Sequence, residues 1–183
     1  MAPRIILIHG PPACGKLTTA QALAAQRGSV ILHNHLTFNL AQALFEIDDP
    51  RLQALHRELR LVMLRHALAA GIPEIIMTMV YAEPDSVGVV AEFNTLLEAY
   101  GGTLYPCYLR CSTRALLSRV TEAGRAAYGK LQSPERLTEL LATHDYRPIP
   151  DPRTFELDND EQSPDTIARK IAAKIAERID RTP

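Results

Sequence analysis

Seven consecutive residues near the N-terminus have the types and the spacing needed to hold phosphate. Gly10 and Gly15 bracket four residues, and Lys16 follows directly, so that the segment reads G-x-x-x-x-G-K. Glycines allow a backbone to wrap closely around a phosphate, while consecutive N–H groups and a helix start form a positive cradle. A lysine at this position can reach the outer phosphates of a nucleotide. The spacing therefore predicts a loop that binds a nucleotide through its phosphate chain.

The loop and the residues after it form one continuous set that we expect to contact the nucleotide: Gly10, Pro11, Pro12, Ala13, Cys14, Gly15, Lys16, Leu17, Thr18 and Thr19. The residue types follow the Walker A motif, and the segment lies between an apolar run and a helical pattern, as that motif requires. Leu17 departs from the motif, because the hydroxyl residue expected there ligates magnesium. Thr18 is better placed to touch the α-phosphate. The alternative is an ordinary tight turn with an exposed lysine.

Three polar residues follow the second apolar run, where they can face a second ligand. His33, Asn34 and His35 carry donors and acceptors that suit the hydroxyl groups of an acceptor molecule. A neutral histidine can also take a proton near neutral pH, which makes His35 a candidate catalytic residue. The alternative is that these side chains only cap or satisfy the start of a helix.

Positive side chains gather between residues 118 and 131. Phosphoryl transfer spreads charge over the oxygens of its transition state. Catalysis therefore needs cations around the phosphoryl group that is transferred. Arg119 lies about two turns into a predicted helix, and Arg125 follows Gly124, where a lid can hinge. We expect both arginines to be catalytic, although exposed arginines on a helix are commonly only solvated charges.

Two carboxylates, Glu83 and Asp85, follow the third apolar run. Ligands of open α/β sheets gather at the carboxyl ends of the strands, so these residues are the best candidates to hold magnesium through water. Asp85 has an alternative role as the N-cap of the next helix.

Alternating strands and helices must position these candidates. We expect strands at residues 4–8, 29–32, 75–80, 104–109 and 154–157, although Pro106 can delay the fourth until Cys107. Helical periodicity covers residues 15–28, 36–47, 50–70, 85–97, 112–121 and 163–179, and Ser133 opens a shorter helix. This alternation implies a parallel sheet that helices cover on both faces.

The long helix after Asp49 carries the clearest pattern. Asp49 followed by Pro50 predicts an N-cap with proline at the first helical position. We assign the buried stripe to Leu52, Leu55, Leu59 and Val62, widened by Leu61, Leu64 and Leu68. His56 then belongs to the polar edge of this helix.

Composition excludes several classes of protein. The 183 residues carry 20 Lys and Arg against 21 Asp and Glu, a formal charge of −1, so no overall field attracts nucleic acid. Apolar runs such as Ile5–Ile8 fall far short of the roughly 20 residues that span a bilayer. We expect one cytoplasmic domain without a signal peptide or a membrane segment. Three cysteines without metal-type spacing indicate reduced thiols.

The loop at residues 10–18 resembles that of adenylate kinases, in which a non-hydroxyl residue also separates the lysine from a threonine. The order of elements is similar to that of the nucleoside-monophosphate-kinase-like group. This group includes shikimate and gluconate kinases, chloramphenicol phosphotransferase and the tunicamycin resistance protein. The resemblance covers the loop closely and the rest of the chain by layout.

The resemblance implies a three-layer P-loop fold with the strand order 2-3-1-4-5, helices on both faces and a small lid. It implies one domain over residues 1–183, with an acceptor-binding segment at about 33–72 and a lid at about 118–150. Asn159 falls where relatives wrap backbone around adenine. The implied cofactors are ATP and Mg²⁺, with the ion held mainly by phosphates and water.

The resulting hypothesis is an ATP-dependent kinase that phosphorylates a hydroxyl of a small metabolite or antibiotic. A nucleoside or nucleotide kinase is the alternative within this fold. A nucleotide-dependent switch or an inactive ATP-binding protein is the alternative outside it. The oligomeric state is left open.

Overall fold

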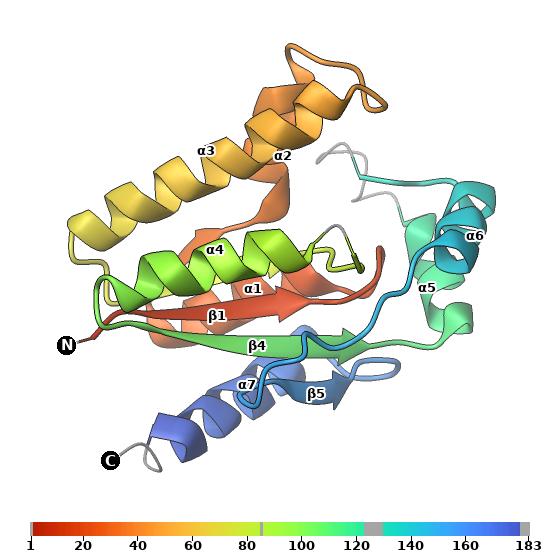
Figure 1. Cartoon of the computed structure of the whole chain (residues 1–183). Coiled ribbons are helices and arrows are strands. Elements are labelled where there is room, and N and C mark those ends of the chain that lie inside the picture. The colour runs from red at the N-terminus through yellow and green to blue at the C-terminus, as the bar shows by residue number, and fades with distance from the viewer. Residues whose placement is uncertain (1, 85, 123–129, 180–183) are drawn as a thin grey trace.

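The computed structural model describes residues 2–84, 86–122 and 130–179 (Figure 1). One parallel sheet of five strands has the order β2-β3-β1-β4-β5, which confirms the order that the resemblance implies. The strands are β1 (Arg4–His9), β2 (Val30–Leu32), β3 (Glu74–Met79), β4 (Thr103–Arg110) and β5 (Phe155–Asp158).

Seven helices are seen within the described residues: α1 (Lys16–Arg27), α2 (Asn34–Gln42), α3 (Pro50–Ala69), α4 (Val87–Glu98), α5 (Thr113–Val120), α6 (Pro134–Thr143) and α7 (Pro164–Ile179). Three predicted helix starts are confirmed by cap hydrogen bonds. Asp49 accepts from the N–H of Arg51, and the hydroxyl of Ser112 accepts from the N–H of Ala115. Ser133 caps α6 in the same way. Each cap satisfies a backbone donor that has no partner inside the helix.

The four middle residues of the central strand β1, Ile5–Ile8, are all apolar because helices cover both faces of the sheet. Ile6 and Ile8 belong to a core that includes residues of α1 and α7, such as Leu23 and Ile171. Ile5 and Leu7 belong to a second core with residues of α3 and α4. Alternate strand side chains point to opposite faces, so one run of four apolar residues supplies both cores. Figure 1 shows α3 and α4 on one side of β1 and β4.

The fourth strand begins at Thr103, so the alternative start at Cys107 is wrong. Pro106 pairs with Leu7 of β1. Pairing with β5 begins one residue later, at Cys107 opposite Phe155. Pro106 therefore lies where β4 has one paired neighbour, a place at which a strand tolerates a residue without an N–H.

The segment between β2 and β3 differs from the sequence prediction in two ways. Helix α2 ends at Gln42 instead of Ile47, and its buried residues are Thr37 and Ala41. In α3 the buried stripe advances by four residues at a time: Leu52, His56, Arg60, Leu64 and Leu68. Val62, which we assigned to that stripe, is 45% exposed. The pattern of apolar residues in the sequence did not predict this buried face of α3, because its middle residues, His56 and Arg60, are polar.

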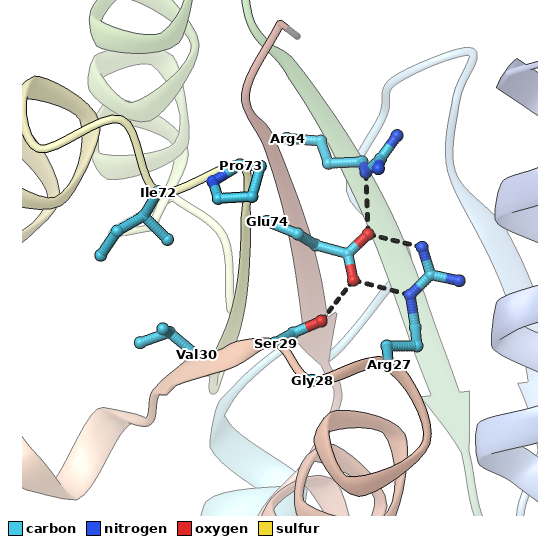
Figure 2. A pocket seen from close by; sticks show the side chains of 8 residues that line it. All are labelled: Arg4, Arg27, Gly28, Ser29, Val30, Ile72, Pro73 and Glu74. Atoms are coloured by element: carbon cyan, nitrogen blue, oxygen red, sulfur yellow. Dashed lines mark hydrogen bonds and ion pairs between the residues drawn. The ribbon is translucent and has the colours of Figure 1, made fainter.

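At the amino-terminal ends of the strands, the carboxylate of Glu74 contacts three segments of the chain (Figure 2). Its carboxylate accepts hydrogen bonds from Arg4 Nε at 2.8 Å and from Arg27 Nε and Nη2 at 2.6 Å each. The hydroxyl of Ser29 also donates to it. Burial alone raises the pKa of Glu74, but the bonds from Arg27 and Ser29 and the two arginine charges outweigh burial and lower the pKa. The cluster ties the starts of β1 and β3 to the end of α1.

Within the described residues, no helix combines the length and the apolar character needed to cross a membrane.

Candidate active site

The loop after β1 curls back on itself because three residues adopt positive φ angles. Gly10, Ala13 and Gly15 have φ angles of 147°, 67° and 86°. A Cβ atom on Gly10 would lie 2.6 Å from the carbonyl oxygen of Leu109, and one on Gly15 would lie 2.9 Å from Nδ2 of Asn159. Both positions therefore require glycine on conformational and steric grounds. The resulting concave backbone can act as a nest for an anion.

Lys16 begins α1, and its side chain folds back along the loop. The ammonium Nζ donates to the carbonyl oxygens of Gly10 at 2.9 Å and Pro11 at 2.6 Å. Leu17 is buried, and the exposed Thr18 donates from its hydroxyl to the carbonyl of Gly15 at 2.8 Å. Thr19 is 1% exposed. Lys16 and Thr18 are thus the two side chains of this turn that offer polar groups at the surface of the loop.

Two elements distant in sequence support the loop at Cys14. The carbonyl oxygen of Cys14 accepts from Nδ2 of Asn159 at 2.7 Å and faces Sγ of Cys111 at 3.7 Å. Burial raises the pKa of the Cys14 thiol, but the Cys111 hydrogen bond and the Lys16 ammonium outweigh it and lower the pKa to about 6. These two contacts therefore attach the loop to the ends of β4 and β5.

The loop opens into a cavity of about 1240 Å³ beyond the carboxyl ends of β1 and β3. Residues of α2 and α3 line one side, and residues of α5, α6 and their connections line the other. Its cationic lining residues are Lys16, Arg57, Arg60, Arg119, Lys130 and Arg136, and its acidic ones within the described chain are Asp48 and Glu122. The formal charge of the protein is −1. Glu92 and Glu139, which lie outside the lining, pair with Arg57 and Arg136. The remaining lining is still more positive than the chain as a whole, which suits anionic ligands.

The three polar residues after β2 begin α2. His33 occupies the N-cap position without a side-chain cap hydrogen bond, whereas Asn34 and His35 line the cavity. The backbone N–H of Asn34 donates to Oγ1 of Thr78 at 3.1 Å, which fixes the start of α2 against β3. Burial, together with the nearby charge of Lys130, lowers the pKa of His35 to about 4. His35 is therefore neutral at pH 7 and keeps an unprotonated ring nitrogen, but its lowered pKa makes it a weaker base than an ordinary histidine.

Arg119 lines the cavity and is tied to the turn after β5. Its Nη2 donates to the carbonyl oxygens of Asn159 at 2.7 Å and Asp160 at 2.6 Å, and Nη1 contacts Sγ of Cys111 at 3.5 Å. The guanidinium thus holds the backbone next to the loop. Arg125 lies outside the described residues.

Asn159 lies in the same connection and is 4% exposed. Its N–H donates to the carbonyl of Arg110 at 2.9 Å, while its side-chain amide holds Cys14. Asn159 also borders the cavity. The structure places it against the loop that follows β1.

The candidate metal carboxylates are less well placed. Glu83 Oε1 accepts from the hydroxyl of Tyr81 at 2.9 Å, and Oε2 lies 3.6 Å from Arg147. Glu83 is absent from the cavity lining. Asp85 lies outside the described residues, and Ser86 occupies the N-cap position of α4.

A magnesium ion at this site would therefore find few ligands among the side chains that the structure describes. No group of three His, Cys, Asp or Glu side chains suited to a metal occurs in the part of the chain that is described. Leu17 provides no oxygen ligand. These residues fit a nucleotide-bound magnesium that is coordinated mostly by phosphate oxygens and water, as that ion readily accepts.

Sequence reasoning missed several cavity residues, among them the buried side chains of His56, Arg60 and Thr78. His56 and Arg60 are 6% and 5% exposed on α3, and Thr78 is buried in β3. For His56 and Arg60, the sequence did contain a signal in their spacing. One face of the helix carries a residue every four positions: Leu52, His56, Arg60 and Leu64. Two polar residues inside a buried helix face indicate a ligand site.

No protein-family model matches the chain, and a search of the curated proteins finds no match. Solved structures, in contrast, do match the chain. A protein of Chloroflexus aurantiacus assigned to the kinases has a TM-score of 0.70 at 20% identity, with 95% of this chain and 99% of that chain covered. A gluconokinase of Sinorhizobium meliloti gives 0.61 at 20% identity, covering 97% and 93%. The APS kinase CysC of Mycobacterium tuberculosis, in complex with AMPPNP and APS, gives 0.62 at 14% identity, covering 96% and 98%.

Proposed function

Because this chain has the fold of the P-loop, nucleoside-monophosphate-kinase-like group, we propose that it is an ATP-dependent small-molecule kinase. It transfers the γ-phosphate of ATP to a hydroxyl group of a small acceptor. One observation carries the proposal: the concave loop with Lys16 opens directly into a positive cavity of about 1240 Å³. Typical single-ligand pockets hold roughly 300–1,000 Å³, so this space suits two ligands together.

The nucleotide lies with its phosphates along the loop. Backbone N–H groups of residues 10–18 and the N-terminus of α1 face the phosphate oxygens. Lys16 exchanges its bonds to the loop carbonyls for contacts with the β- and γ-phosphates, and Thr18 donates to the α-phosphate. Asn159 and Arg119 hold the loop and the neighbouring turn in place. Bound Mg²⁺ neutralises the triphosphate.

The acceptor lies between the segment at about 33–72 and the lid at about 118–150. Its hydroxyl oxygen forms a bond to the γ-phosphorus while the bond from phosphorus to the β–γ bridging oxygen breaks, which releases ADP. The hydroxyl proton leaves to neutral His35 or to water. Lys16 and Lys130, which line the cavity, supply positive charge to the transferring oxygens, and Arg125 remains a candidate for the same role from the sequence alone.

A screen for ADP release tests this function. The protein is incubated with ATP and magnesium against separate pools of sugars and sugar acids, nucleosides and nucleotides, and hydroxylated antibiotics. We expect one pool to stimulate ADP release above the basal rate and to yield a phosphorylated product by mass spectrometry. Stimulation by the nucleoside and nucleotide pool alone would favour a nucleoside or nucleotide kinase. Acceptor-independent hydrolysis that depends on a protein partner would favour the switch and contradict the proposal.

A further inference from the structure

Two cysteine thiols meet beneath the loop that follows β1. Cys14 belongs to the loop and is fully buried, whereas Cys111 lies directly after β4 and is partly buried. Sγ of Cys111 lies 3.7 Å from the carbonyl oxygen of Cys14, and its thiol donates a hydrogen bond to the Cys14 sulfur. The two residues are 97 positions apart in the chain. They meet because β1 and β4 are parallel neighbours, so that the segments after both strands lie at one edge of the sheet.

Each sulfur of the pair also faces a positive charge. The ammonium of Lys16 lies 3.6 Å from Sγ of Cys14, and Nη1 of Arg119 lies 3.5 Å from Sγ of Cys111. Burial alone raises the pKa of Cys14, but the Cys111 hydrogen bond and the charge of Lys16 lower it to about 6. The hydrogen bond to Cys14, together with burial, raises the pKa of Cys111. At neutral pH the pair therefore holds one thiolate and one thiol, the two forms from which a disulfide is made.

The third cysteine provides a comparison within the same protein. Cys107 is fully buried on β4 among apolar side chains of the core. Burial raises its pKa, and a thiol that stays protonated reacts slowly with oxidants. Cys14 and Cys111 differ from it because their sulfurs adjoin each other and two cations, and because Cys111 reaches the surface. A low-pKa thiol beside a second cysteine is typical of a redox-sensitive site.

We propose that Cys14 and Cys111 are a modification site, at which a peroxide forms a reversible disulfide that prevents nucleotide binding. The partly exposed Cys111 reacts first, after its proton has moved to Cys14. The Cys111 thiolate forms a bond to one peroxide oxygen while the O–O bond breaks, and the leaving hydroxide takes a proton from solvent. The sulfur of Cys14 then bonds to that of Cys111, and the S–O bond breaks with release of water. The two thiols lose two electrons and two protons, and hydrogen peroxide becomes two molecules of water.

The disulfide would change the loop at the point where phosphate is expected to bind. Cys14 lies between Ala13 and Gly15, whose φ angles of 67° and 86° shape the concave backbone. A covalent bond holds two sulfurs closer than a hydrogen bond does, so it draws Cys14 toward the end of β4. The N–H groups of the loop then no longer converge on one anion. Oxidation therefore weakens nucleotide binding.

Bound nucleotide acts on the pair in return. In the proposed complex, Lys16 leaves Cys14 for the phosphates, which also bring negative charge close to the thiolate. Both changes disfavour the thiolate and thereby slow its oxidation. At equilibrium the nucleotide disfavours the disulfide by the same factor by which the disulfide weakens nucleotide binding. The effect on binding rests on the proposed kinase function, whereas formation of the disulfide does not.

Peptide mapping detects the disulfide without any assumption about activity. The reduced protein is treated with hydrogen peroxide near neutral pH, its remaining thiols are blocked with N-ethylmaleimide in denaturant, and it is digested with trypsin. Cleavage after Arg110 separates Cys111 from Cys107, so each cysteine lies on a different peptide. We expect peptide 5–16 to be joined to peptide 111–114 and Cys107 to carry the blocking group. A saturating non-hydrolysable ATP analogue should slow this reaction.

The effect on binding is measured as the Kd of the same analogue before and after peroxide. Cys111→Ser keeps a donor beside Cys14 but cannot form the disulfide, and Cys107→Ala removes the third thiol as the matched control. We expect peroxide to raise the Kd about 10-fold or more in the wild type and in Cys107→Ala, and to leave it unchanged in Cys111→Ser. Dithiothreitol should restore the wild-type Kd, a comparison that depends on no variant. Circular dichroism of each reduced protein checks its folding.

The outcomes separate this inference from the proposed function. Three blocked thiols after peroxide, or a disulfide that includes Cys107, would overturn the modification site. A disulfide between Cys14 and Cys111 with an unchanged Kd would overturn its effect on binding, as would an equal rise of the Kd in Cys111→Ser. Failure of the reduced wild type to bind the analogue would refute the kinase and with it the effect on binding. The joined peptides would still establish the disulfide in that case.

Discussion

The side-chain amide of Asn159 donates to the carbonyl oxygen of Cys14 at 2.7 Å, a bond between residues 145 positions apart. Asn159 lies after β5, and Cys14 lies in the loop after β1. The same asparagine donates its backbone N–H to Arg110 at the end of β4. One buried residue thus connects three strand ends around the proposed phosphate site.

Replacing Asn159 with alanine removes the donor from the buried carbonyl of Cys14. We expect a loss of about 1–3 kcal/mol in the free energy of unfolding, because a buried polar group is left unpaired. We also expect weaker ATP binding, since the loop is no longer held in its concave shape. Urea denaturation and ATP titration measure the two effects. Asn94→Ala on α4, outside the cavity, is the control, and equal effects in both variants would contradict this role.

Lys16→Ala tests the phosphate-binding loop. We expect a loss of about 100-fold or more in phosphoryl transfer, because in the proposed complex the ammonium contacts the phosphates where charge develops. The circular dichroism spectrum should be unchanged, since Lys16 is only half-buried. Lys174→Ala, an exposed position on α7, provides the control. Wild-type transfer by Lys16→Ala would refute the assignment of the loop.

Arg119 offers a test of positioning against direct catalysis. Its guanidinium holds the carbonyls of Asn159 and Asp160, so Arg119→Ala should raise the KM for ATP roughly 10-fold through loss of charge-assisted hydrogen bonds. A fall in kcat with an unchanged KM would show instead that Arg119 acts on the transferring phosphoryl group. Arg114→Ala on the same helix is a matched control, because Arg114 is 88% exposed.

The pH dependence of transfer tests His35. Burial lowers its pKa to about 4, so His35 stays in its neutral, proton-accepting form from neutral pH down to about pH 5. We expect no loss of kcat near pH 6.5, where an ordinary histidine takes up a proton. His35→Gln should lower kcat by roughly 100-fold at all pH values if the ring accepts the hydroxyl proton. An unchanged kcat in His35→Gln would remove His35 from the catalytic residues.

Because of Glu74, we expect the free energy of unfolding to decrease at acidic pH. Because the folded protein holds the pKa of Glu74 below its unfolded value, its contribution is fully present above the ordinary pKa of glutamate. The contribution is lost as the pH falls below that value and through the folded pKa. We expect Glu74→Ala to lower the free energy of unfolding by about 3 kcal/mol at pH 7 and by much less at pH 3. Urea denaturation at both pH values measures this difference.

An exposed glutamate provides the comparison. Glu139 pairs with Arg136 on the surface of α6, and both side chains are more than half exposed. Exposed pairs contribute at most about 1 kcal/mol, so Glu139→Ala should change stability little at either pH. Equal effects at positions 74 and 139 would contradict the structural role of the buried cluster.

Much of the fold could be predicted from the sequence because its signals are local. Ile5 and Ile6 are successive residues of β1 and pack in two different cores, on opposite faces of the sheet. Asp49 and Ser112 cap the helices that follow them. Local signals failed where a buried face is polar. Apolar periodicity placed Val62 in the core of α3, whereas the structure buries His56 and Arg60 there.

The sequence by itself determined the concave loop that we propose binds phosphate, because Gly10, Gly15 and Lys16 act through backbone conformation and sequential spacing. Only the tertiary structure decided which distant side chains meet this loop. Asn159 comes from the turn after β5 and Arg119 from the crossover between β4 and β5, while Arg60 reaches the same cavity from α3. The parallel sheet aligns the carboxyl ends of its strands at one edge, which brings these residues together although no sequence spacing relates them.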